Sequence, residues 1–206
     1  AARRSLGALP PERRIAVDID HLLAGPGPLA RGYGHMDFEY DLEPGREADG
    51  ERHALPRYRH RRSGHGADSS FGAHVYNTPV TYRDEPQTYL NVPPGLTTRL
   101  FLRVGDAPLD TVCHLIYPAS LPWHAQSATR LILHDARGEE VAACDVRIPC
   151  GGSLFFRYSE QFDERARGRA GQGAYILVRD LTCRLFGFHG LTGAEGVFSL
   201  DHMFGF

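Results

Sequence analysis

The chain has 206 residues, 42% of them hydrophobic and 23% charged, which is the composition of an ordinary folded protein that buries a core. Its formal net charge of -2 argues against general attraction to nucleic acid or to membrane surfaces. No apolar run approaches the ~20 residues needed to cross a bilayer, so we expect no membrane span.

Residues 1–70 are predicted to form an extended N-terminal arm with two short strands and a linker. Apolar and polar or small residues alternate over 15–19 and over 36–42, and this period of two is typical of half-buried strands. Gly and Pro at 25–28 separate the two segments. An acidic stretch to Glu51, an Arg-rich block over 52–62 and a Ser/Gly-rich linker over 63–70 complete the arm.

This arm cannot bury enough apolar surface by itself to offset the entropy lost on ordering. We therefore expect it to lie either against its own domain or against another subunit. The hypothesis we favour is strand addition to a neighbouring chain, in a complex with a protein partner or in a homo-oligomer, with Phe38 and Tyr40 as apolar anchors. We do not expect nucleic acid as a partner.

Residues 71–206 are predicted to form an all-β domain, an antiparallel β-sandwich that is immunoglobulin-like or jelly-roll-like. Many short alternating or apolar runs separated by Gly and Pro turns indicate this class. Residues 135–138 predict a hairpin loop, because Gly138 suits a positive φ. One short helix is expected over 159–169, with acids early, Arg late and Gly168 near its end.

Cys113, Trp123 and Cys183 follow one another in the order that an antibody-type domain uses for its core disulfide and tryptophan. In this respect the chain resembles the immunoglobulin family, and the resemblance implies architecture alone. Two features depart from the family: Trp123 lies in a Pro-interrupted loop, and Leu181 stands where the tyrosine corner has Tyr.

The four Cys form no Cys-x-x-Cys pair, which gives no support to zinc-knuckle or thioredoxin-type chemistry. Cys113, Cys144 and Cys183 lie in apolar runs, where a thiol packs as a small hydrophobe. We expect Cys113 and Cys183 to be buried, close together and unbridged, in a protein of the cytoplasm. The first residues show no signal peptide, although the chain opens without Met, so removal of an upstream segment stays open.

Metal candidates are His35 and Asp37, whose His-x-Asp spacing is that of a facial triad, with His74 or His114 as a third ligand. A His-x-Asp pair arises readily by chance in a chain with 11 His. A metal-dependent His/carboxylate enzyme is therefore the alternative function, and no cofactor is expected.

Partner- or ligand-binding candidates are Tyr117, Trp123 and His124 on a Pro-rich loop, together with Phe38 and Tyr40 of the arm. Aromatic loop residues anchor protein partners or stack on sugars. The first hypothesis is thus a non-enzymatic accessory or structural subunit that binds a protein partner. A carbohydrate-binding module using Trp123 is the third.

Overall fold

The computed structural model describes residues 5–8, 10, 13–22, 32–36, 51–69, 71–74, 98–117 and 124–203, with the backbone alone at 51–54 and 71–74. The chain divides into two compact units, Ala1–Gly34 and His35–Phe206. The boundary expected near residue 70 stays a prediction.

The first unit holds a short helix, α1 (Ile19–Leu22), where the sequence pattern predicts a strand. The strand predicted over 15–19 is wrong, because Asp18 starts a helical turn. Its carboxylate accepts hydrogen bonds from the backbone N–H groups of Asp20 (3.0 Å) and His21 (3.3 Å), as an N-cap residue does. Of the second predicted strand, only Met36 lies among the described residues.

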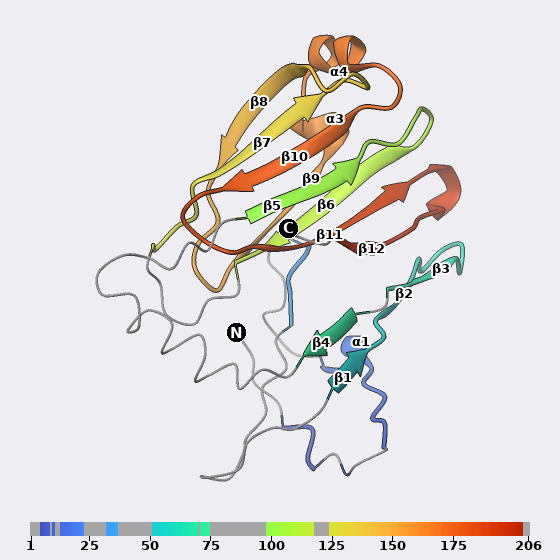
Figure 1. Cartoon of the computed structure of the whole chain (residues 1–206). Coiled ribbons are helices and arrows are strands. Elements are labelled where there is room, and N and C mark those ends of the chain that lie inside the picture. Colours follow the sequence, from blue (N-terminus) through green and yellow to red (C-terminus); the bar gives the residue numbers. More distant parts are fainter. Residues whose placement is uncertain are drawn as a thin grey trace. The chain divides into compact units, whose positions relative to one another are not determined.

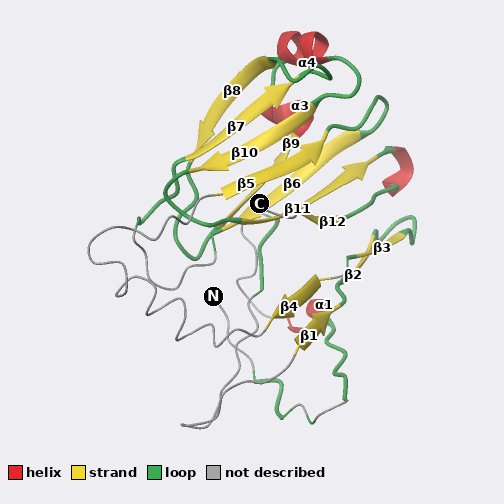
Figure 2. Ribbon diagram, viewed as in Figure 1, coloured by secondary structure: helices red, strands yellow, loops and turns green. Residues whose placement is uncertain are grey.

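Most of the described chain after residue 97 forms two four-stranded antiparallel sheets (Figures 1 and 2). The all-β prediction is confirmed at this level. In sheet order, the first sheet is β5 (Thr98–Arg103), β10 (Tyr175–Asp180), β7 (Thr129–His134) and β8 (Glu140–Val146). The second is β12 (Asp201–Met203), β11 (Phe186–Thr192), β6 (Asp110–Ile116) and β9 (Ser153–Arg157). We call this part, residues 98–203, the two-sheet body.

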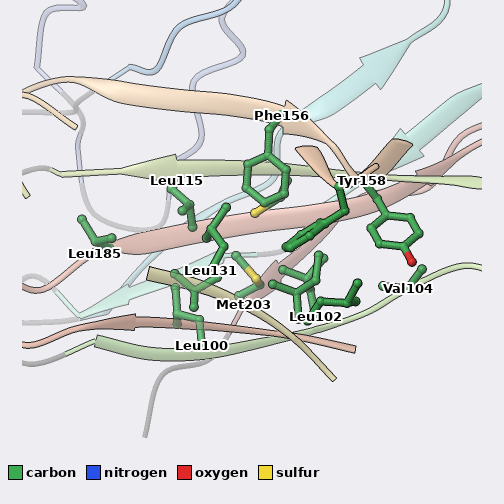
Figure 3. Packing of buried hydrophobic residues seen from close by; sticks show 14 of the residues in the cluster. Leu100, Leu102, Val104, Leu115, Leu131, Phe156, Tyr158, Leu185 and Met203 are labelled. Atoms are coloured by element: carbon green, nitrogen blue, oxygen red, sulfur yellow. The ribbon is translucent and has the colours of Figure 1, made fainter. Parts of the chain in front are cut away.

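Side chains from both sheets form one hydrophobic core (Figure 3). Along β5, burial alternates residue by residue, so Leu100 and Leu102 face the core while Arg99, Phe101 and Arg103 face outward. Fully burying a leucine side chain stabilises the fold by ~1.5–3 kcal/mol. Residues from β5, β7 and β10 meet residues from β6, β9 and β12; the main contributors are Leu100, Leu102, Leu131, Leu133, Ile176, Val178, Cys113, Leu115, Phe156 and Met203.

The helix predicted over 159–169 is two helices, α3 (Tyr158–Gln161) and α4 (Glu164–Ala170). The break has a physical cause at Phe162 and Asp163. Phe162 takes an extended conformation and is buried in the core, and the Asp163 carboxylate then caps α4 by accepting from the Ala166 N–H at 2.7 Å. The turn predicted at 135–138 is confirmed, with Gly138 at φ 88°.

Residues 51–74 form a nested pair of two-stranded sheets, which we call the arm hairpin. β1 (Glu51–Ala54) pairs with β4 (Phe71–His74), and β2 (Arg57–Arg59) pairs with β3 (Gly66–Asp68). The linker predicted over 63–70 is therefore wrong in part, because Gly66–Asp68 is a strand. The Arg57 guanidinium donates two hydrogen bonds to the Asp68 carboxylate, at 2.9 and 3.0 Å, and the two residues lie directly opposite each other in the inner sheet.

Cys113 and Cys183 are buried as predicted, and all four cysteines are free thiols. Burial raises the pKa of Cys183 to about 12 and that of Cys113 further still, so both thiols stay protonated and unreactive at neutral pH. Cys144 is half-buried, and its sulfur accepts a hydrogen bond from Gln161 Nε2 at 3.1 Å. The expected closeness of Cys113 to Cys183 stays a prediction.

Candidate interaction surfaces

Tyr117 lies at the C-terminal end of β6 and is buried, with 2% of its surface exposed. Its hydroxyl donates a hydrogen bond to the backbone carbonyl of His124 at 3.1 Å, so the ring joins the two ends of the loop between them. Burial is the main cause that raises the pKa of Tyr117 to about 12. Tyr117 is therefore part of the hydrophobic core. The side chain of His124 is half-buried.

The remaining aromatic candidates, Trp123, Phe38 and Tyr40, lie outside the described residues. Their binding role stays a prediction, as does that of His124.

Of the metal candidates, only His35 and His114 have described side chains, and these two lie close enough to interact electrostatically. His35 is half-buried, Asp37 lies outside the described residues, and His74 is described only as backbone in β4. Among the described side chains, no group of three or more His, Cys, Asp or Glu has the arrangement of a metal site. The pKa of His114 is lowered to about 4. Burial is the main cause, and electrostatic repulsion from His35 is the second.

Asp180 is the most deeply buried carboxylate of the two-sheet body, with 1% of its surface exposed. It accepts hydrogen bonds from the hydroxyls of Thr129 (2.7 Å) and Thr182 (2.6 Å) and from the backbone N–H groups of Thr182 (2.6 Å) and Cys183 (3.0 Å). Burial opposes ionisation, but these hydrogen bonds outweigh it and lower the pKa of Asp180. The carboxylate is saturated, which makes it a structural group that ties β10 to β7.

The outward face of the first sheet carries a row of arginines. Arg179 on β10 lies directly opposite Arg99 on β5 and directly opposite Arg130 on β7. The row ends at Asp145 on β8, which lies opposite Arg130. All three arginines are exposed, and Leu100, Val178 and Leu131 beside them in sequence face the core.

Two further rows run parallel to the arginine row. The next row is apolar and consists of Phe101, Leu177, Ile132 and Ala143; the third consists of Arg103, Tyr175, His134 and Glu140. Phe101 is 40% exposed, and the Arg99 guanidinium lies 5.4 Å from the centre of its ring. Tyr175 stacks on His134 with ring centres 4.9 Å apart. We call the surface formed by Arg99, Phe101, Arg103, Arg130, Tyr175 and Arg179 the arginine–aromatic face.

Positive charge on this face is balanced at one edge alone within the described part of the chain. Arg130 lies 3.5 Å from Asp145 and 3.7 Å from Glu140. Arg99, Arg103 and Arg179 form no ion pair with any described residue. Like charges placed directly opposite on neighbouring strands destabilise a sheet. The row is therefore unfavourable for the isolated sheet and would be stabilised by an anionic ligand.

The outward face of the second sheet has a different character. One row across it consists of Phe155, His114, Phe188 and His202, from β9, β6, β11 and β12. The rings of His114 and Phe155 and those of Phe188 and His202 meet edge to face. The arginine row thus lies on the outward face of the first sheet, and the aromatic–histidine row on that of the second.

Sequence reasoning missed the arginine–aromatic face, although the alternation of polar and apolar residues along β5 is visible in the sequence. Arg99, Phe101 and Arg103 alternate with apolar residues in the sequence, and all 23 basic residues of the chain are arginines, which suit bidentate contacts to carboxylate or phosphate. The row itself depends on which strands pair, because Arg179 lies far along the chain from Arg99. No local pattern gives that pairing.

Comparison of the chain with protein-family models, with curated proteins and with solved structures returned no match. Within the described residues, no helix combines the length and the apolar character needed to span a membrane.

Proposed function

We propose that the chain is a non-enzymatic accessory or structural subunit that binds a protein partner through its N-terminal arm. The observation that carries the proposal is the exposure of apolar side chains along the described parts of the arm. Leu55 is 73% exposed and Tyr58 is 42% exposed, and both lie in the arm hairpin. Leu6, Ile15 and Met36 are exposed as well.

The backbone of the arm hairpin supports the same proposal. β1 pairs with β4 alone and β2 with β3 alone, so each of these strands leaves one edge open among the described residues. A two-stranded sheet is marginally stable in water, and an open edge pairs readily with a strand of another chain. Strand addition supplies backbone hydrogen bonds, while Leu55 and Tyr58 supply apolar contact. The Arg-rich block then steers and aligns the association.

The two-sheet body is, in this proposal, an immunoglobulin-like scaffold. A constant-type immunoglobulin domain has the strand orders A-B-E-D and C-F-G. If β6, β7, β9 and β10 are taken as B, C, E and F, then B lies beside E and C beside F here too. The edges differ, since β5 lies beside β10 and β11 lies beside β6. The central strands support the interpretation, and the edge strands depart from it.

Replacing Leu55 and Tyr58 together with serine should abolish association of the full chain with its partner. Both side chains are exposed, so the fold should be unchanged, whereas the loss of two apolar anchors at an interface weakens binding by ~100-fold or more. The measurement is light scattering of the full chain over a range of concentrations for self-association. If the partner is a different protein, it is isolated by affinity capture, and the association is then measured with the reconstituted purified pair.

Leu181→Ser is the matched control, because Leu181 is an exposed leucine of the two-sheet body, with 65% of its surface accessible. This control should associate as the unchanged chain does. Association that survives the loss of Leu55 and Tyr58, or that fails equally in the control, would contradict the role of the arm hairpin.

A further inference from the structure

The arginine–aromatic face has the chemistry to bind an extended, carboxylate-rich protein segment. Arg99 and Arg179 lie side by side, exposed, and without an ion pair among the described residues. A guanidinium forms two parallel hydrogen bonds to a carboxylate, which an ammonium group cannot do. The adjoining apolar row, with Phe101 exposed at its edge, offers contact for apolar side chains that alternate with the carboxylates.

The sequence of this chain contains one such segment. Between residues 37 and 51 there are seven carboxylates and a single arginine. Over the first part of it, Asp37, Glu39 and Asp41 alternate with Phe38 and Tyr40. In extended backbone, this alternation places the carboxylates on one side and the aromatic rings on the other. Charge and apolar character therefore match between the segment and the face.

We infer that the arginine–aromatic face of one copy receives the acid-rich segment, residues 37–51, of a second copy. This inference rests on the proposed function, for which it names the partner and the receiving surface. The exchange is reciprocal in a two-fold dimer, because each copy offers one face and one segment. Carboxylates of the segment pair with Arg99 and Arg179, and thereby remove the repulsion between these neighbouring side chains.

The position of His35, just before the acid-rich segment, favours docking of the segment from a second copy over docking within one copy. His35 lies near enough to His114 to influence its pKa, and His114 points outward from the second sheet. The arginine row lies on the outward face of the other sheet, and packed sheets are ~10 Å apart. Two residues of extended chain span at most ~7 Å. Within one copy, a chain that leaves His35 would first have to pass round an edge of the two-sheet body to reach the arginine row, whereas the segment of a second copy is free of this constraint.

A protein segment is also favoured over a nucleic acid. Nucleic-acid affinity comes mainly from neutralising many phosphates, and proteins that bind this way carry a large excess of positive charge. The present chain has a net charge of -2, and the arginine row ends at Asp145, with Glu140 nearby. Tyr175, moreover, is already stacked on His134. Single-stranded nucleic acid is accordingly an outcome of the test below.

The experiment is sedimentation equilibrium of the full chain at low and high salt. The paired change Arg99→Gln and Arg179→Gln should weaken dimerisation roughly tenfold or more at low salt, since two charge-assisted contacts are lost in each half. Arg165→Gln with Arg169→Gln on α4 is the control, with the same charge change at exposed positions, and should dimerise normally. Thermal melting at a concentration where the unchanged chain is monomeric monitors the fold, and there the face variant should melt no lower because like charges have been removed.

A mixing experiment distinguishes exchange between copies from docking within one copy. An arm variant with Asp37→Asn, Glu39→Gln and Asp41→Asn should dimerise as weakly on its own as the face variant does. Mixed together they should associate more tightly than either variant does alone, because one intact face then meets one intact segment. A labelled oligothymidylate, followed by fluorescence anisotropy, should bind no more weakly to the face variant than to the control.

Each result has a defined consequence. A monomeric full chain, equal effects of the face and control changes, or no tighter association on mixing would overturn the inference. Oligothymidylate binding that depends on Arg99 and Arg179 would overturn it in favour of nucleic acid. If association depends on Leu55 and Tyr58 but is indifferent to the arginines, this inference fails while the proposed function stands.

Discussion

Replacing Asp180 with alanine should lower the free energy of unfolding by about 3 kcal/mol. The carboxylate is buried and receives four hydrogen bonds, from Thr129, Thr182 and Cys183. Its removal leaves four donors without their acceptor, of which the Thr129 hydroxyl and the Cys183 N–H are buried. Urea denaturation, followed by tryptophan fluorescence and circular dichroism, measures the change.

The effect of Asp180 should depend on pH in one direction. Its pKa in the folded chain is lowered, so it contributes stability above the unfolded value of ~3.9, and this contribution is lost as pH falls through the folded pKa. The difference between the unchanged chain and Asp180→Ala should therefore shrink in acid. Thr129→Val removes one donor and should cost only about 1 kcal/mol. A difference that stays constant into strong acid would show that Asp180 does not act as a buried anion.

Gly190→Ala should destabilise the chain by about 3 kcal/mol, at the upper end for overpacking. Gly190 lies in β11, and a β-carbon there would fall on the backbone carbonyl of Ser199, with the Leu200 side chain beside it. A rotamer change cannot relieve this clash because the obstacle is backbone. The Ser199 N–H donates to the Leu191 carbonyl at 2.8 Å, so moving Ser199 breaks that hydrogen bond.

Gly168→Ala is the control for this prediction. Gly168 lies in α4, where an added β-carbon meets nothing within 4 Å, and alanine favours a helix over glycine by ~1 kcal/mol. This variant should be as stable as the unchanged chain or more so. Equal stability of Gly190→Ala and Gly168→Ala in urea would refute the close approach of the chain at Ser199.

The core of the two-sheet body was predictable because its signal is local. Leu100 and Leu102 alternate with Arg99, Phe101 and Arg103, and a period of two shows one buried face whatever the partner strand is. The same reasoning failed around Ile15 to Ile19, where Asp18 caps a helical turn. A cap depends on one side chain and its backbone neighbours, which an alternation pattern does not register.

The candidate surface was less predictable than the core. The arginine row exists because β10 lies between β5 and β7, and that order joins Arg99, Arg179 and Arg130 from three separate stretches of sequence. Tyr117 stands beside a Pro-rich stretch of sequence, where an aromatic suggests a binding platform, but in the structure its ring is buried and its hydroxyl donates to the His124 carbonyl. Exposure of an aromatic residue is decided by tertiary packing.

Hydrogen exchange of the full chain, read by mass spectrometry, tests most directly whether the arm makes the protein contact. The comparison is between dilute chain and chain in the complex that it forms with its partner. Backbone amides of β1 and β2, at the open edges of the arm hairpin, should exchange more slowly in the complex, because added strands pair with them. Exchange in the arm hairpin that is the same in both states, with protection confined to the two-sheet body, would contradict the account.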